Sequence, residues 1–158
     1  MEEVIINDRR VKFEGGEIWS YIKYGRSLNY KWRLIKGCKN SAGYHNMTIN
    51  NKIFGKHRVM YKLHNPNWDM TDNCSLNYID HIDRDPMNNK IENLRCVSQT
   101  QNCYNKNSKG YYWHKASKKW LAQIRYGTGL QKYLGIFEVE EDARNAYLDA
   151  KLIYHIID

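Results

Sequence analysis

Residues 78–104 read Y-I-D-H-I-D-R-D-P-M-N-N-K-I-E-N-L-R-C-V-S-Q-T-Q-N-C-Y, and this stretch decides the fold around it. It begins as an apolar strand and reaches the polar pair Asp80-His81. A turn rich in Asp, Asn and Pro follows, and the chain returns through Asn93 as a second strand. Ser98 and Gln101 fit a capping box, which predicts a helix over about residues 99–106 that carries Asn102. This order is expected to bring an Asp, a His and two Asn together.

These residue types suit metal-assisted cleavage of a phosphodiester. Divalent ions prefer hard oxygen ligands, and Asp80 and Asn102 offer a carboxylate and an amide oxygen. His81 is the candidate general base, because imidazole titrates near neutral pH. Neighbouring side chains of a regular strand point to opposite faces, so one shared pocket requires a bend at Asp80-His81. Asn93 is expected either to hold the imidazole or to brace the loop.

The pattern D-H-I-D-x-D-P-x-N-N-x-x-x-N-L-R…Q-N resembles the HNH motif of phage- and intron-encoded homing endonucleases. The resemblance implies two strands and a helix around one divalent ion, Mg²⁺ or alternatively Mn²⁺. It implies Asp80 and Asn102 as metal ligands and His81 as general base. Asn93, twelve residues after His81, matches the middle Asn of the motif. The pair Asn88-Asn89 matches a structural part of the loop.

The resemblance covers about residues 45–107 and includes the upstream H-R-V at His57 to Val59. Residues 57–64 predict a short helix that ends at Asn65-Pro66. His57 and Arg58 either face phosphate or form a polar helix end on the surface. Arg58 and Arg95 are predicted DNA contacts.

Composition points to an anionic partner. The chain has 158 residues, a net charge of +8 and 42% hydrophobic residues, and a pI near 9.3. Nucleic acid is the first expectation and an anionic membrane surface the second. The sequence lacks an apolar run of the roughly 18 residues that span a bilayer, and Met1-Glu2-Glu3 does not read as a signal peptide. We expect a soluble intracellular protein of a phage- or virus-infected cell, or of a host cytoplasm or nucleus, that is not secreted.

The four cysteines are Cys38, Cys74, Cys96 and Cys103, and none form a C-x-x-C pair. Free thiols are expected, with a distorted zinc site near the central motif as the alternative.

The first 56 residues are expected to form a small antiparallel sheet. Short apolar or alternating runs lie at 4–6, 18–22 and 30–35, and Gly37 falls among the turns between them. Residues 47–54 predict a hairpin that turns at Asn50-Asn51.

The C-terminal part predicts a basic sheet backed by one helix. From Tyr104 to Phe137 there are seven Lys or Arg and no Asp or Glu. Strand-like segments lie at 111–114, 119–126 and 131–134. Acidic residues then open a helix from about Glu138, and Ala143, Tyr147 and Ala150 share its apolar face.

K-G-Y-Y-W, K-W-L-A-Q-I-R, Y-L-G-I-F and E-E-D-A-R-N-A-Y make residues 107–155 similar to the Apetala2-type DNA-binding domain of plant ethylene-response factors. This implies a three-stranded sheet in the major groove, although several arginines of the plant domains are missing here. The predicted DNA contacts of this region are Tyr112, His114, Lys115, Lys118, Gln123, Arg125, Gln131, Lys132 and Tyr133. Gln123 and Arg125 suit base edges, whereas Lys115, Lys118 and Lys132 suit phosphate.

The sequence thus predicts an α+β chain in three regions: a β-rich region (1–56), a ββα-metal HNH nuclease unit (57–106) and an Apetala2-like domain (107–158). The expected activity is site-specific cleavage of double-stranded DNA with one divalent ion. The alternatives are a catalytically idle DNA-binding or regulatory protein, and a restriction or defence nuclease with the same chemistry. RNA suits a major-groove sheet less well than B-form DNA does. Both a monomer and a homodimer remain open.

Overall fold

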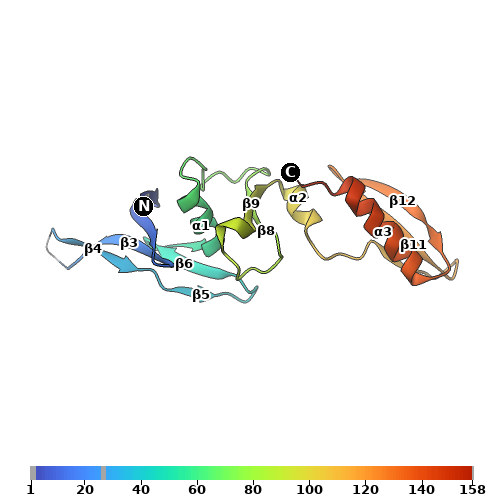
Figure 1. Ribbon diagram of the computed structural model, residues 1–158, viewed down its shortest axis with the longest axis horizontal. Coiled ribbons are helices and arrows are strands. Elements are labelled where there is room, and N and C mark those ends of the chain that lie inside the picture. The colour runs from blue at the N-terminus through green and yellow to red at the C-terminus, as the bar shows by residue number, and fades with distance from the viewer. Residues whose placement is uncertain (1–2, 26–27, 158) are drawn as a thin grey trace. The chain divides into compact units, whose positions relative to one another are not determined.

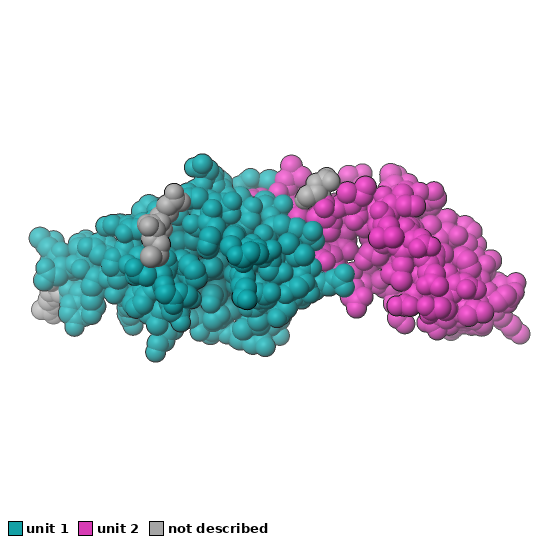
Figure 2. All heavy atoms as spheres, viewed as in Figure 1, with its two compact units in different colours: residues 1–74, 79–96 teal, residues 75–78, 97–158 magenta. Residues whose placement is uncertain are grey.

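The computed structural model describes residues 3–25 and 28–157. It is α+β, with small antiparallel sheets and helices α1, α2 and α3 in the described part. The chain divides into two compact units, residues 1–74 with 79–96 and residues 75–78 with 97–158 (Figure 2). Met1 and Glu2, used above against a signal peptide, lie outside the described residues. None of the described helices is long and apolar enough to cross a membrane.

The first unit begins with a four-stranded antiparallel sheet in sequential order, β1 (Glu3–Ile6), β2 (Arg9–Glu14), β3 (Glu17–Lys23) and β4 (Tyr30–Leu34) (Figure 1). Val11 pairs with Ser20, and both are buried. The neighbouring Lys12 lies on the opposite face, over the ring of Trp32. Strand β2 was not predicted, because charged residues separate its apolar ones.

A second, three-stranded sheet follows, with β5 (Gly37–Lys39), β6 (His45–Ile49) and β7 (Lys52–Gly55). The prediction of one N-terminal sheet was therefore wrong: Gly37, read as a turn, opens β5 and pairs with Met47. The predicted turn at Asn50-Asn51 is confirmed, with φ of 48° and 65° at the two residues. Positive φ at both central positions is the geometry of a type I′ hairpin turn.

Two hairpin turns of the first unit are tied together by amides. Asn7, in the β1–β2 turn, donates from Nδ2 to the carbonyls of Ile49 and Asn50 at 3.1 and 3.0 Å. Asn50 returns a bond from its Nδ2 to the carbonyl of Asn7 at 3.0 Å. We call this reciprocal contact the Asn7–Asn50 clamp. It joins the two sheets at their turns.

Helix α1 (Lys56–His64) packs its apolar face, Val59, Met60 and Leu63, into the core that both sheets share. Asn65 and Pro66 follow its end, as expected. Arg58 donates to the carbonyl of Met70 at 2.8 Å and lies over the ring of Trp68. This arginine therefore anchors the loop after α1, and its predicted DNA contact stays a prediction.

The central motif forms a two-stranded sheet of β8 (Tyr78–His81) and β9 (Leu94–Val97). The 3₁₀ turn η1 (Ile91–Asn93) lies between the strands, directly before β9, and α2 (Gln99–Tyr104) follows β9. The elements come in the expected order, and the ββα-metal arrangement itself stays a prediction. The capping box at the start of α2 is confirmed: Ser98 Oγ accepts from the backbone of Gln101, whose side chain accepts from the backbone of Ser98.

The second unit holds an antiparallel sheet of β10 (Tyr111–His114), β11 (Lys119–Tyr126) and β12 (Leu130–Phe137), with α3 (Glu140–Tyr154) lying against it (Figure 1). Ile124, Tyr147 and Ala150 form its buried centre. A side chain at Gly110 would place Cβ 1.9 Å from the Tyr147 ring. Glycine is therefore required there, because the ring packs directly on the backbone.

Candidate active site

Strand β8 ends in three consecutive buried residues instead of the alternation of a half-buried strand. Ile79 joins the apolar core with Leu94 of β9. Asp80 and His81 are only 7% and 5% exposed. Burying two polar side chains costs free energy unless each finds a partner. Their partners therefore define the site.

Asp80 forms an ion pair with Arg95 of β9. Arg95 donates from Nε and Nη2 to Oδ2 of Asp80, at 3.0 and 2.9 Å. Two charge-assisted bonds to one oxygen fix the carboxylate and compensate its buried charge. Arg95, predicted as a DNA contact, is therefore first a partner of the predicted metal ligand.

His81 lies in a different set of contacts. Its Nε2 is 3.3 Å from Oδ1 of Asn89, which is itself buried. Its ring lies 5.2 Å from that of His57 on α1 and 6.0 Å from that of Tyr44. Burial lowers the pKa of His57 to about 4, with smaller contributions from His81 and Arg58. A neutral His57 can lie against His81 without charge repulsion.

Gly55 makes room for that arrangement. A Cβ at this position would lie 2.5 Å from the His57 ring. Nδ1 of His57 is buried, and the described chain gives it no hydrogen-bond partner. The sequence predicted only a phosphate contact or a surface position for His57. In the structure it is a neighbour of the candidate base, His81.

The loop between β8 and β9 is held by its own side chains. Asn93 accepts from the backbone of Asp83 at 3.0 Å and donates to Oδ1 of Asp83 at 2.9 Å and to the carbonyl of Asn88 at 2.8 Å. Asn88 donates to Oδ2 of Asp83 at 2.6 Å. The bonds that the Asp83 carboxylate accepts from Asn88, from the backbone of Asp85 and from Asn93 lower the pKa of Asp83.

Of the two roles expected for Asn93, bracing of the loop is the one the geometry shows. The amide next to His81 is Asn89, which the sequence had marked only as structural. Asn89 is held in turn by a bond from its Nδ2 to the carbonyl of Met87 at 2.9 Å. No sequence signal separated it from Asn88.

Asn102, the second predicted metal ligand, lies on α2 in the second unit. Its pairing with Asp80 stays a prediction. Over the described residues, no group of three or more His, Cys, Asp or Glu side chains could hold a metal. The predicted pair of one carboxylate and one amide oxygen still suits a hard cation such as Mg²⁺, which keeps several waters. None of the four cysteines, all within the described residues, forms a disulfide, and Cys38, Cys74 and Cys103 are exposed.

The sheet of the second unit presents an open polar face. Gln131 donates from Nε2 to Oε1 of Gln123 at 2.7 Å and accepts from Nε of Arg125 at 3.3 Å. Tyr112 and Tyr133 are 45% and 58% exposed. The residue types expected to read base edges thus lie beside one another on neighbouring strands.

The other predicted contacts are distributed differently. Lys132 donates to the hydroxyl of Tyr154 on α3 at 2.5 Å, which raises the pKa of Lys132. His114 is bonded through Nδ1 to Ser117 Oγ at 2.9 Å. Lys115 and Lys118 lie exposed in the β10–β11 turn. Lys132 therefore reaches toward the helix, away from Gln131 and Tyr133.

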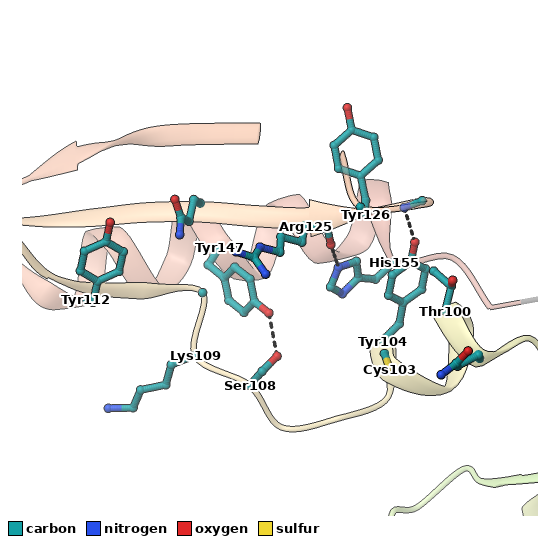
Figure 3. Close-up of a pocket in the computed structure, with 15 residues that line it drawn as sticks. Thr100, Cys103, Tyr104, Ser108, Lys109, Tyr112, Arg125, Tyr126, Tyr147 and His155 are labelled. Carbon is teal, nitrogen blue, oxygen red and sulfur yellow. Dashed lines mark hydrogen bonds between the residues drawn. The ribbon is translucent and has the colours of Figure 1, made fainter. Parts of the chain in front are cut away.

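A cavity of about 500 Å³ lies beside this face, within the second unit (Figure 3). Arg125, Tyr112 and Lys109 are among its lining residues. At one end, Tyr104 and His155 stack with ring centroids 4.1 Å apart. The backbone of Gly127 donates to the Tyr104 hydroxyl at 2.7 Å, and His155 Nε2 lies 2.8 Å from the carbonyl of Arg125. No local sequence pattern predicts this stack.

Residues 54–104 match the family model described as HNH endonuclease. The match runs from β7 through α1, the Asp80-His81 pair and the loop to α2, and it supports an HNH nuclease. HNH nucleases act on DNA and generally use a divalent metal. Neither a curated protein nor a solved structure matches the chain.

Proposed function

We propose that this chain is a metal-dependent, site-specific DNA endonuclease of the HNH homing type, with His81 as the general base. The observation that carries the proposal is the buried Asp80-His81 pair at the end of β8, inside the region that matches the HNH model. Each member has its own partners, as a site of fixed geometry requires.

His81 takes the proton of the attacking water. Asn89 and His57 limit how its ring can turn, and a neutral His57 leaves the imidazole free to accept a proton. Asn93 keeps the loop in the conformation that places Asn89 against the ring. Products carrying a 5′-phosphate and a 3′-hydroxyl are expected.

Asp80 and Asn102 would hold one divalent ion, Mg²⁺ or Mn²⁺. When bound, such an ion stabilises charge on the scissile phosphate and the leaving 3′ oxygen. Arg95 fixes the orientation of the Asp80 carboxylate through its Oδ2. The sheet of the second unit docks on duplex DNA as an Apetala2-type domain, with Gln123, Arg125 and Gln131 toward the bases.

The test is cleavage of supercoiled plasmids carrying candidate target loci, with Mg²⁺ or Mn²⁺, by the wild type and by His81→Ala. Loss of a general base is expected to slow cleavage by roughly 10²–10⁴-fold. His64→Ala is the matched control, because His64 belongs to the same unit and bonds only to its own helix at the carbonyl of Met60. If wild type and His81→Ala are equally inert with every metal and target, the nuclease proposal fails. Tight DNA binding without cleavage would support the idle DNA-binding protein instead.

A further inference from the structure

Apart from His57 and its neighbour Arg58, one long basic stretch has no part in the function proposed above. Between Ile18 and Trp68 the sequence has ten Lys or Arg and no Asp or Glu. The whole chain has a net charge of +8, so this stretch alone exceeds the net charge of the protein. Such a one-signed stretch produces a strong local field for an anionic partner.

Part of this charge gathers around a groove in the first unit. The groove has a volume of about 480 Å³ and lies between the β3–β4 end of one sheet and the β6–β7 turn of the other. Arg9, Arg33 and Lys36 line it together with the polar residues Thr48 and Asn50. No acidic side chain is among the described residues that line it.

The groove is rigid on one side and open on the other. The Asn7–Asn50 clamp fixes the turn that forms one wall, and Arg9 donates from Nε to Oδ1 of Asn50 at 3.1 Å. Arg33 and Lys36 are exposed, and neither forms an ion pair with any residue in 3–25 or 28–157. Their charges are therefore available to a ligand.

The opposite face of the same sheet shows that this is a local property. There Arg10 pairs with Glu3, and Lys12 pairs with Glu14 at 2.7 Å. Both cations also lie over the ring of Trp32. Arg10 and Lys12 are thus neutralised by neighbouring carboxylates, whereas Arg33 and Lys36 beside the groove form no ion pair with a described residue.

We propose that this groove of the first unit, lined by Arg9, Arg33 and Lys36, binds the phosphate backbone of duplex DNA. The inference rests on DNA being the substrate, as proposed above. Exposed cations with hydroxyl and amide neighbours suit phosphate oxygens and carry no base information. The first unit, which also carries Asp80 and His81, then has a DNA contact of its own, separate from the sheet of the second unit.

The test measures DNA binding by Arg33→Gln/Lys36→Gln in the His81→Ala background, by fluorescence anisotropy without metal over a range of salt concentrations. Each lost phosphate contact is expected to reduce the slope of log K against log salt by about 0.9, so the double variant should lose about 1.8. Affinity near 0.1 M salt should fall roughly ten- to fiftyfold, equally for all DNA sequences.

Arg10→Gln/Lys12→Gln is the matched control, because it removes one Arg and one Lys from the opposite face of the sheet. Its salt slope should stay within about 0.5 of the parent. An unchanged salt slope in the groove variant, or an equal change in both variants, overturns the proposal. So does a groove variant that loses binding to duplex RNA and keeps its binding to duplex DNA. If the double variant fails to fold by circular dichroism, Lys36→Gln alone gives the same test with a slope change of about 0.9.

Binding without metal also keeps this proposal separate from the nuclease. If the wild type never cleaves DNA, the proposal of nuclease activity fails, and the salt slopes still test DNA binding by the groove. If the wild type cleaves DNA and the groove variant keeps the salt slope of its parent, only the proposal of DNA binding by the groove fails.

Discussion

The loop between β8 and β9, beside Asp80 and His81, and the sheet formed by β10, β11 and β12 are built in opposite ways. In the loop, Asn93 is held by three hydrogen bonds and Asn89 is buried. On the sheet, the side chains of Gln123, Arg125 and Gln131 bond to one another, and those of Arg125 and Gln131 are exposed. Fixed geometry suits bond cleavage, whereas side chains that can exchange partners suit binding. The variants below break or sharpen this comparison.

The largest effect is expected from Asp80→Ala. Cleavage should fall to background, and the free energy of unfolding should fall by about 3 kcal/mol, because Arg95 keeps its charge and loses its partner. Adding Arg95→Met should restore most of the stability and none of the cleavage. Urea denaturation and plasmid cleavage measure the two effects. Full stability of Asp80→Ala alone would contradict the role of the ion pair.

The next largest effect is expected in the pH dependence of stability, through His57 of the first unit. The folded pKa of His57 is lowered to about 4, so between pH 6.5 and 4 the unfolded chain binds a proton that the folded chain does not. Stability is therefore complete above pH 6.5 and falls as the pH approaches 4, by about 2–3 kcal/mol for this partly exposed ring. His57→Gln should remove that part of the loss, as seen by urea denaturation at pH 7, 5 and 4. Identical pH profiles for both proteins would contradict the prediction.

Gly110→Ala probes the second unit. The φ of Gly110 is not positive, so the main obstacle to alanine is the ring of Tyr147, 1.9 Å from its Cβ. We expect a loss of about 1–3 kcal/mol from overpacking, seen as faster hydrogen exchange in β10, β11 and α3. Ser108→Ala is the control: it removes only the 3.1 Å contact with the Tyr147 hydroxyl and should cost about 1 kcal/mol or less. Equal effects of the two variants would contradict the packing argument.

The smallest effect on stability is expected from Gln131→Ala. Its loss frees Gln123 and Arg125, and the free energy of unfolding should change by less than about 0.5 kcal/mol. Discrimination at one or two base pairs should change by about 1–3 kcal/mol. Selection from a library of target variants measures this, with Thr128→Ala in the neighbouring turn as control. An unchanged target profile would remove Gln131 from the predicted readout.

The sequence was enough to pick out the Asp80-His81 pair and the helix cap at Ser98, because each depends on local spacing. It could not separate Asn88 from Asn89. The two amides are adjacent, and only the folded loop turns one toward Asp83 and the other toward His81.

Contacts across strands were equally hidden. The pairing of Arg95 with Asp80 depends on how β8 and β9 are aligned, and the stack of Tyr104 on His155 joins residues far apart in the chain. Strand β2 was missed because Arg10 and Lys12 interrupt its apolar residues, although aromatic rings and glutamates neutralise them in the fold. Local pattern alone did not identify a strand whose charges are balanced by its neighbours.

The loop between β8 and β9 has a consequence for how such sites spread between proteins. Asp83 and Asp85 each accept a backbone N–H two residues further on, and Asn93 closes the loop at its far end. Because Asp83, Asp85 and Asn93 form these hydrogen bonds within the loop, its conformation depends on the rest of the protein mainly for two paired strands and an apolar support. It has the properties of a portable cassette, and grafting residues 81–94 onto another two-stranded ribbon should transfer its shape with few changes to the recipient.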